Sequence, residues 1–264
     1  MIVKCQENDL KSVFEYIGND YGNCLYIYID LKKYGLNNKD FNVWYQMNAD
    51  NEIHAVITEY YKGIQIYSRY NDFVFEEIAD FLKDKNASLV FARKETADII
   101  KEYLSGFSEE HGVVGKFMGL KCEPNKDAYS ASDKEVSEIV ALVAADEDIG
   151  KPYGYDSLFD QYTSRREDNF GRNYILRDKE TNTIISHAGT YAELPELAVI
   201  GGVITAPEYR GKGYSKGNLA ALCLELQSEN KDVFSFFYVP SAMKMHYGVG
   251  FEKYCDWVKL IKEK

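Results

Sequence analysis

Apolar residues at helical spacing predict two amphipathic helices in the second half of the chain. Each stripe follows the i, i+3, i+4, i+7 pattern of a helix with one buried face. The stripes are Val136, Ile139, Val140, Val143 and then Leu219, Leu222, Cys223, Leu226. Ser132 and Glu135 stand where a capping box would begin the first helix.

Runs of β-branched and aromatic residues, bounded by turn residues, predict the strands around these helices. The predicted strands are Asn173–Arg177, Thr183–Tyr191, Leu197–Thr205, Asp232–Val239 and a final strand pair within Phe251–Lys262. Further helices are expected at Ser157–Arg166 and Ser241–Tyr247. From about residue 130 the predicted order is α α β β β α β α β.

The first half shows a weaker version of this order. Its predicted strands are Leu25–Ile29, Phe41–Met47, Ile53–Tyr61, Gly63–Ser68, Ser88–Ala92 and Gly112–Leu120, with helices around Phe75–Leu82 and Glu95–Leu104. The repeated order suggests an internal duplication. A polar connection containing Pro124 separates the halves, so the expected domains are 1–125 and 126–264.

Charge and cysteine usage narrow the class of protein. The formal net charge is −11, and the resulting field repels DNA, RNA and anionic lipid. Five scattered cysteines form no CxxC pair, which argues against a zinc site or a disulfide framework. No apolar run approaches the ~18 residues of a membrane span. We therefore expect a soluble cytoplasmic protein without metal, nucleic-acid or membrane partners.

The strongest chemical signal is the glycine-bearing turn Arg210–Ser215, which follows a predicted strand and begins a predicted helix. Successive backbone N–H groups at a helix start can hold a diphosphate. Gly211 and Gly213 would let the backbone approach the oxygens, while Arg210 and Lys212 would offset their charge. The spacing GxGxxxG fits neither the Walker pattern nor GxGxxG. The equivalent turn in the first half, SRYNDF, has no glycine.

This turn, RGKGYS, resembles the R/Q-x-x-G-x-G/A cofactor motif of the GNAT superfamily of N-acetyltransferases. The later segment PSAMKMHYGVGFEKY is similar to the family's tyrosine-bearing helix and Gly-Phe turn. The resemblance implies an α+β fold, a mixed and mostly antiparallel sheet flanked by helices. It covers about half of the chain, in tandem with a degenerate GNAT-like first half. Ser215 and Pro240 depart from the residues usual in the family.

The resemblance implies acetyl-CoA as cofactor and acetyl transfer to an amine of a small molecule or peptide. It places the diphosphate on Arg210, Gly211, Lys212, Gly213, Tyr214 and Ser215, and the pantetheine arm on the backbone of Val203, Ile204 and Thr205. Tyr247 is the expected proton donor to the departing thiolate. Glu193 and Glu196 are candidates for the base, with solvated turn residues as the equal alternative.

Three further interpretations concern side chains near these positions. The glycines Gly201 and Gly202 predict a bulge or splay that opens a slot between strands. His187 is interpreted as a hydrogen-bonded core residue in preference to a base, and Phe159 and Tyr162 as core residues in preference to an acceptor wall. A non-catalytic CoA-binding regulatory module and an aminoacyl-tRNA-dependent transferase remain as alternative functions.

Overall fold

The computed structural model describes residues 1–61, 63–147 and 149–263, which belong to two compact units. Unit 1 comprises Met1–Val113 and Tyr254–Lys264, and unit 2 comprises Val114–Lys253. The chain therefore returns to unit 1 at its end. The compact units are bounded differently from the halves 1–125 and 126–264 that the sequence suggested, because the last strand packs with the first unit.

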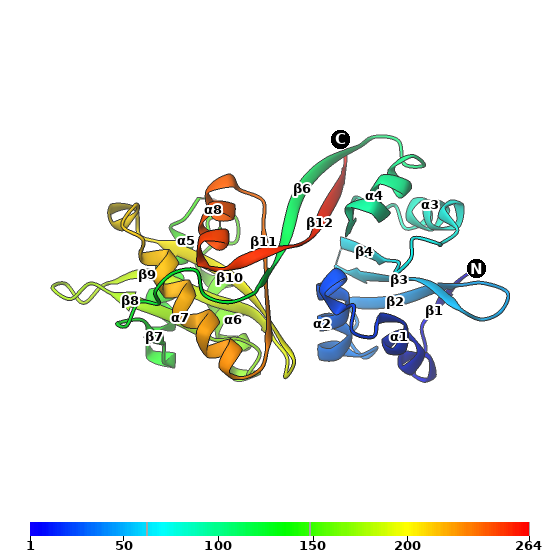
Figure 1. The fold of residues 1–264 in the computed structure, drawn as a ribbon. Coiled ribbons are helices and arrows are strands. Elements are labelled where there is room, and N and C mark those ends of the chain that lie inside the picture. Colours follow the sequence, from blue (N-terminus) through cyan, green and yellow to red (C-terminus); the bar gives the residue numbers. More distant parts are fainter. Residues whose placement is uncertain (62, 148, 264) are drawn as a thin grey trace. The chain divides into compact units, whose positions relative to one another are not determined.

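The first ten elements follow one another in a mixed order (Figure 1). They are β1 Ile2–Lys4, α1 Leu10–Ile17, α2 Leu25–Tyr34, β2 Phe41–Met47, β3 Ile53–Tyr60, β4 Gly63–Tyr67, α3 Phe75–Asp84, β5 Leu89–Arg93, α4 Lys94–Lys101 and β6 Phe107–Phe117.

The next ten elements repeat the same order of types. They are β7 Tyr129–Ser130, α5 Val136–Ala144, α6 Tyr155–Glu167, β8 Asn173–Arg177, β9 Ile184–Glu193, β10 Leu197–Thr205, α7 Tyr214–Ser228, β11 Asp232–Phe237, α8 Pro240–Val249 and β12 Phe251–Lys262. In each series a 3-10 turn with a capping box precedes the first helix, at Gln6–Asp9 and at Ser132–Glu135. This correspondence confirms the predicted tandem arrangement.

Each unit has a mixed sheet. The strand order is β1-β2-β3-β4-β5-β12 in unit 1 and β6-β11-β10-β9-β8-β7 in unit 2. Each sheet therefore includes a terminal strand of the other series, since β12 lies beside β5 and β6 beside β11. The pairings with described registers are antiparallel, except β4 with β5 and β10 with β11, which are parallel. The predicted fold class is confirmed.

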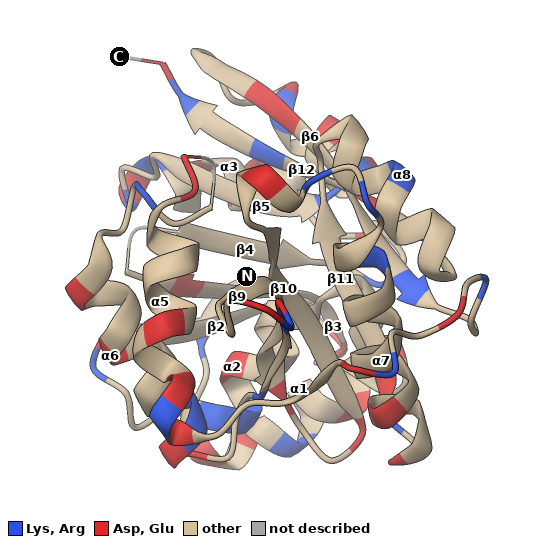
Figure 2. Ribbon diagram, turned by 90° about the vertical axis from the view of Figure 1, so that its left-hand side faces the viewer, with Lys and Arg blue, Asp and Glu red and all other residues tan. Residues whose placement is uncertain are grey.

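Helices cover both faces of the unit 2 sheet (Figure 1). On one face the predicted α7 stripe is fully buried against β9, β10 and β11. On the other face the predicted α5 stripe packs with α6, Ile175 and Ile204. Charged residues lie mainly on the helices and loops (Figure 2), and β9 and β10 carry a single Asp, Glu, Lys or Arg between them, Glu193.

Two predicted elements differ from the structure in type or in number, and the strand predicted at Gly112–Leu120 begins five residues earlier, as β6. Leu25–Ile29 was predicted as a strand but begins helix α2, which ends at Gly35, where the backbone φ is 56°. The helix is buried on more than one face, so its apolar run lacks a clear helical period. Phe251–Lys262 is one strand of 12 residues and not a strand pair. The short elements β1, α1 and β7 carried no signal that we recognised.

Within the described residues, no helix is both long enough and apolar enough to cross a bilayer.

Candidate functional site

Two β-bulges distort the pairing of β9 with β10. Val199 pairs with Ala192 and Ile200 with Thr190, so Tyr191 is an extra residue on β9. Further along, Gly201 pairs with Gly189 and Ile204 with His187, which leaves two residues of β10 opposite one of β9. Gly202 lies in this second bulge with φ 61°. Bulges often re-aim side chains next to functional sites, and the irregularity predicted from Gly201 and Gly202 is confirmed.

Between these two bulges the pairing of β10 with its parallel neighbour β11 ends. Their register runs from Leu197 paired with Asp232 to Ile200 paired with Ser235. β10 continues to Thr205 past the last paired residue. Gly201–Thr205 therefore makes no register pair with β11 among the described residues, although side chains contact the carbonyls of Gly202, Ile204 and Thr205. Val203, Ile204 and Thr205, the residues predicted to contact the cofactor arm, all lie in this segment.

The glycine turn lies at the end of this strand segment and begins α7. Gly211 and Gly213 have φ values of 79° and 83°, in the left-handed region that favours glycine. An added Cβ at either position would meet nothing within 4 Å, so both backbones border open space. Gly213 is the N-cap of α7, and no side chain among the described residues caps the helix. The first N–H groups of α7 therefore remain for an outside acceptor.

The basic side chains near the turn differ in their contacts with the rest of unit 2. Arg210 Nε donates to the Thr205 carbonyl at 3.0 Å, and its Nη2 pairs with Asp146 at 3.0 Å. Arg210 thus fixes the turn to the strand, and its charge is already compensated in part. Lys212 lies over the Tyr209 ring at 5.2 Å. Lys216, in the first turn of α7, is a cation that we did not single out from the sequence.

A buried chain of polar side chains fixes the turn from behind. The Ser215 and Thr205 hydroxyls are hydrogen-bonded to each other. Thr205 continues to the hydroxyl of Ser186, and Asn218 Nδ2 donates to that hydroxyl at 3.4 Å and to the Tyr174 carbonyl at 3.2 Å. Ser215, the departure from the usual small apolar residue, therefore anchors α7 to β10 and β9.

Tyr247 lies on α8, which begins just after β11 ends. Its side chain remains 37% exposed, and its ring meets Phe237 edge-on at 5.5 Å. None of the residues that the structure describes hydrogen-bonds its hydroxyl. Pro240 occupies the first turn of α8, where proline is tolerated because that N–H has no helical partner.

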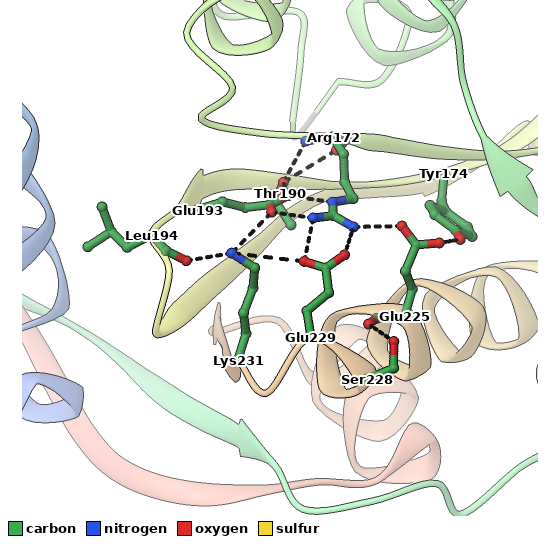
Figure 3. Close-up of polar contacts among 9 residues, drawn as sticks. All are labelled: Arg172, Tyr174, Thr190, Glu193, Leu194, Glu225, Ser228, Glu229 and Lys231. Atoms are coloured by element: carbon green, nitrogen blue, oxygen red, sulfur yellow. Dashed lines mark hydrogen bonds and ion pairs between the residues drawn. The ribbon is translucent and has the colours of Figure 1, made fainter.

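Glu193 and Glu196 lie at the opposite end of β10 from the turn. Glu193 is 7% exposed and binds Arg172 through two hydrogen bonds, of 2.9 Å and 2.7 Å (Figure 3). Thr190 also donates to Glu193. Arg172 further pairs with Glu225 and Glu229 of the α7 end, and this contact lowers the pKa of Glu229. The Glu196 carbonyl accepts from the Asp232 amide. The side-chain contacts of Glu193 favour a structural role for it over proton transfer.

His187 is a fully buried core residue, as interpreted from the sequence. Its ring nitrogens lie 2.6 Å from the Gly202 carbonyl and 2.9 Å from Asn173 Oδ1. Burial lowers its pKa to about 4, although the Gly202 contact acts in the opposite direction. Tyr162 is likewise buried, which confirms its interpretation, whereas Phe159 is 37% exposed and stacks on Tyr155. The interpretation of Phe159 as a core residue was wrong, because it faces outward from α6.

Unit 1 contains the corresponding strands without the corresponding turn. β4 and β5 are parallel and pair from Gly63 with Leu89 to Gln65 with Phe91. Helix α3 then begins after Val74, in extended conformation, and has Glu76 and Glu77 in its first turn. Those carboxylates disfavour an anion at that helix start. α7 has no acidic residue in its first turn.

Solved structures with this architecture cover the whole chain. A GCN5-related N-acetyltransferase from Sphaerobacter thermophilus is 13% identical, with 100% of this chain and 95% of the other covered and a TM-score of 0.70. A GNAT-family acetyltransferase from Colwellia psychrerythraea is 12% identical, with both chains fully covered and a TM-score of 0.63. A tandem GNAT protein from the clavulanic acid biosynthesis pathway is 11% identical, with 98% and 97% covered and a TM-score of 0.62.

At these identities the likeness establishes the fold, which is that of the GNAT acetyltransferases in a two-part arrangement. In sequence, residues 137–242 match the model of the acetyltransferase (GNAT) family, and this segment is a GNAT domain. It includes the bulged strand, the glycine turn and the start of α8. No curated protein matches the chain in sequence.

Proposed function

We propose that unit 2 is an acetyl-CoA-dependent N-acetyltransferase that acts on an amine of a small molecule or peptide. The observation that carries this proposal is the continuous path from the strand segment Gly201–Thr205, which lies beyond the described pairing with β11, to the start of α7, which no side chain of the described residues caps. A strand edge can hold an extended amide-containing arm, and a helix start can hold a diphosphate. Coenzyme A contains both groups, joined in that order.

The residues present fit this ligand. Gly211 and Gly213 border open space in the conformation that brings backbone amides close to phosphate oxygens. Lys212 and Lys216 would offset the phosphate charge, whereas Arg210 mainly fixes the turn through Asp146. Tyr214 and Ser215 would contribute the first helical amides. Coenzyme A would supply the acetyl group as an activated thioester.

The chemistry then requires few specialised side chains. The amine nitrogen forms a bond to the acetyl carbon as the carbon–sulfur bond breaks, the nitrogen loses a proton, and the sulfur gains one. Tyr247, which is 37% exposed on α8, would provide the proton to the sulfur. Positioning two reactants contributes up to ~7–11 kcal/mol, and proton transfer about 10²–10⁴-fold.

The proton acceptor is the less defined part of the proposal. Glu193 is neutralised by Arg172 within the network of Figure 3. Glu196 lies five residues before Gly201 along β10, which corresponds to about 16 Å of extended strand. Because Glu193 is paired with Arg172, Glu196 stays the candidate base of the two predicted carboxylates, and at this separation it would act through more than one water. Glu193 is assigned a structural role.

Unit 1 is proposed to be an accessory GNAT-like unit without its own coenzyme A. The acidic first turn of α3, with Glu76 and Glu77, would repel a diphosphate.

Thiol release tests the proposal. The whole chain is incubated with acetyl-CoA and a panel of amines, and free coenzyme A is detected as its thiol forms. Tyr247→Phe should lower kcat about 100-fold while coenzyme A binding, measured by calorimetry, stays within twofold. Tyr103→Phe is the matched control, because Tyr103 has a similar exposed fraction, 38%, and lies in unit 1. Absence of coenzyme A binding by the unmodified chain would refute the proposal.

The alternative of a non-catalytic coenzyme A module rests on Pro240 and on the structural role of Glu193. It predicts normal binding of coenzyme A but no amine-dependent thiol release. The same two measurements therefore separate a transferase from a binding module.

A further inference from the structure

Arg165 is the arginine of unit 2 that has no carboxylate partner within the described residues. The other four arginines of the unit form ion pairs: Arg166 with Asp133, Arg172 with Glu193, Glu225 and Glu229, Arg177 with Glu135 and Glu138, and Arg210 with Asp146. In a chain with a net charge of −11, carboxylates are abundant. An unpaired guanidinium is therefore a distinctive feature of this site.

Arg165 is nevertheless held in one place. Its guanidinium carbon lies 5.1 Å from the Tyr162 ring centroid and 4.8 Å from the Tyr191 ring centroid. Its Nη2 donates to Gln161 Oε1, one helical turn earlier, at 3.0 Å. Stacking on aromatic faces and one hydrogen bond orient the planar group. Arg165 is partly exposed, and most of its N–H donors remain for a ligand.

Tyr191 connects this cation with the bulged part of β10. It is the extra residue of the first bulge, and its ring lies against Gly201, where an added Cβ would stand 2.3 Å from the ring. Arg165 is thus separated by one aromatic ring from the strand segment proposed to hold the thioester arm.

A second unpaired polar group points to the same place. The Tyr162 hydroxyl is buried and has no hydrogen-bond partner within the described chain. An added Cβ at Gly202 would stand 2.8 Å from it. A buried hydroxyl without a partner costs free energy unless a ligand or water satisfies it. The α6 face of the bulge therefore has a fixed cation one aromatic ring away from Gly201 and a buried, unpaired hydroxyl beside Gly202.

We propose that the acceptor amine carries a carboxylate and that Arg165 binds this carboxylate. The inference rests on the proposed acetyl transfer and names its acceptor class, an amino acid or a closely similar amino carboxylate. A planar guanidinium matches a carboxylate through two parallel N–H···O bonds. An acidic acceptor would otherwise be repelled by the net negative charge, so a local cation has a specific purpose at this site.

Matched acceptors test the proposal with the whole chain. Free amino acids, their primary amides and the corresponding decarboxylated amines are compared by thiol release, and acidic dipeptides form a separate arm. Wild type should favour the amino acids over both uncharged series. Arg165→Gln should lower kcat/KM for amino acids about 10- to 100-fold and change the amides and amines less than threefold. Arg166→Gln, a neighbouring arginine already paired with Asp133, is the matched control.

The outcomes separate this inference from the transferase proposal. Equal loss of kcat/KM for charged and uncharged acceptors in Arg165→Gln would assign Arg165 a structural role and overturn the inference. So would turnover confined to uncharged amines, or coenzyme A binding with no turnover of any amino acid or dipeptide. If only dipeptides were acetylated and Arg165→Gln abolished this transfer, Arg165 would still be the group that binds the acceptor carboxylate. The acceptor would then be a peptide. Failure to bind coenzyme A would instead refute the transferase proposal itself.

Discussion

Replacing Gly213 by alanine should separate the two requirements of the glycine turn, its backbone conformation and its open space. Gly213 has φ 83° and ψ 7°, which is left-handed helical backbone. An L-residue in this conformation costs about 1–2 kcal/mol. The added methyl group meets no atom within 4 Å, so no packing penalty adds to this cost. Domains are typically stable by about 5–15 kcal/mol, and the variant should therefore remain folded.

The matched control is Gly106→Ala in unit 1. Gly106 has φ 73°, and its added Cβ would also meet nothing within 4 Å. The two variants should lose the same free energy of unfolding, measured by urea denaturation. Only Gly213→Ala places a methyl group where the diphosphate is proposed to lie. Its dissociation constant for coenzyme A should rise at least about tenfold, equivalent to about 1.4 kcal/mol.

Calorimetric titration with coenzyme A decides the question. Wild-type affinity in Gly213→Ala would refute the turn as the diphosphate site. Equal loss of affinity in both variants would show that stability and not the turn governs binding. A difference of more than about 2 kcal/mol between their unfolding free energies would contradict the reasoning from open space.

Three further predictions concern the interior of unit 2. Arg172→Met should lower the free energy of unfolding by about 3 kcal/mol, because Glu193 would stay buried without its main partner; a loss below about 1 kcal/mol in urea denaturation would contradict this. Glu193→Gln should also lower stability but keep kcat within twofold, whereas a tenfold fall of kcat in thiol release would restore Glu193 as the base. Burial lowers the pKa of His187 and His246 to about 4. As the pH falls, these histidines are therefore protonated in the unfolded chain before they are protonated in the folded chain. The free energy of unfolding should therefore fall as the pH drops from about 6.5 to 4, by up to about 3 kcal/mol for each histidine. His246→Gln should make the free energy of urea unfolding less dependent on pH, and an unchanged dependence would contradict this prediction.

Elements with a local signal could be predicted closely. β2, β8 and β10 have the predicted bounds, Ser132 and Glu135 form the predicted capping box, and the glycines of the turn adopt positive φ. These features depend on residues within one or two turns of each other. Helix α2 was not predicted as a helix, because it is buried on several faces. Its apolar residues therefore do not follow the period of a helix with one buried face.

The contacts that define the site lie outside such local patterns. Arg210 pairs with Asp146, which is 64 residues away in sequence, and Arg172 pairs with Glu229, which is 57 residues away. The sequence shows the charged residues but not these pairings. For this reason Glu193 could be considered as a base, and no sequence pattern indicated a binding role for Arg165. Its importance follows from the absence of a carboxylate partner among the described residues, which only the folded chain reveals.

By itself the sequence determined the order of most elements, the repeated architecture and the glycine turn, because spacing and backbone preference act over a few residues. Tertiary structure decided the return of β12 to unit 1, the parting of β10 from β11 and the partners of each buried charge. These depend on strand register and on contacts between distant segments, whose energies no local pattern contains.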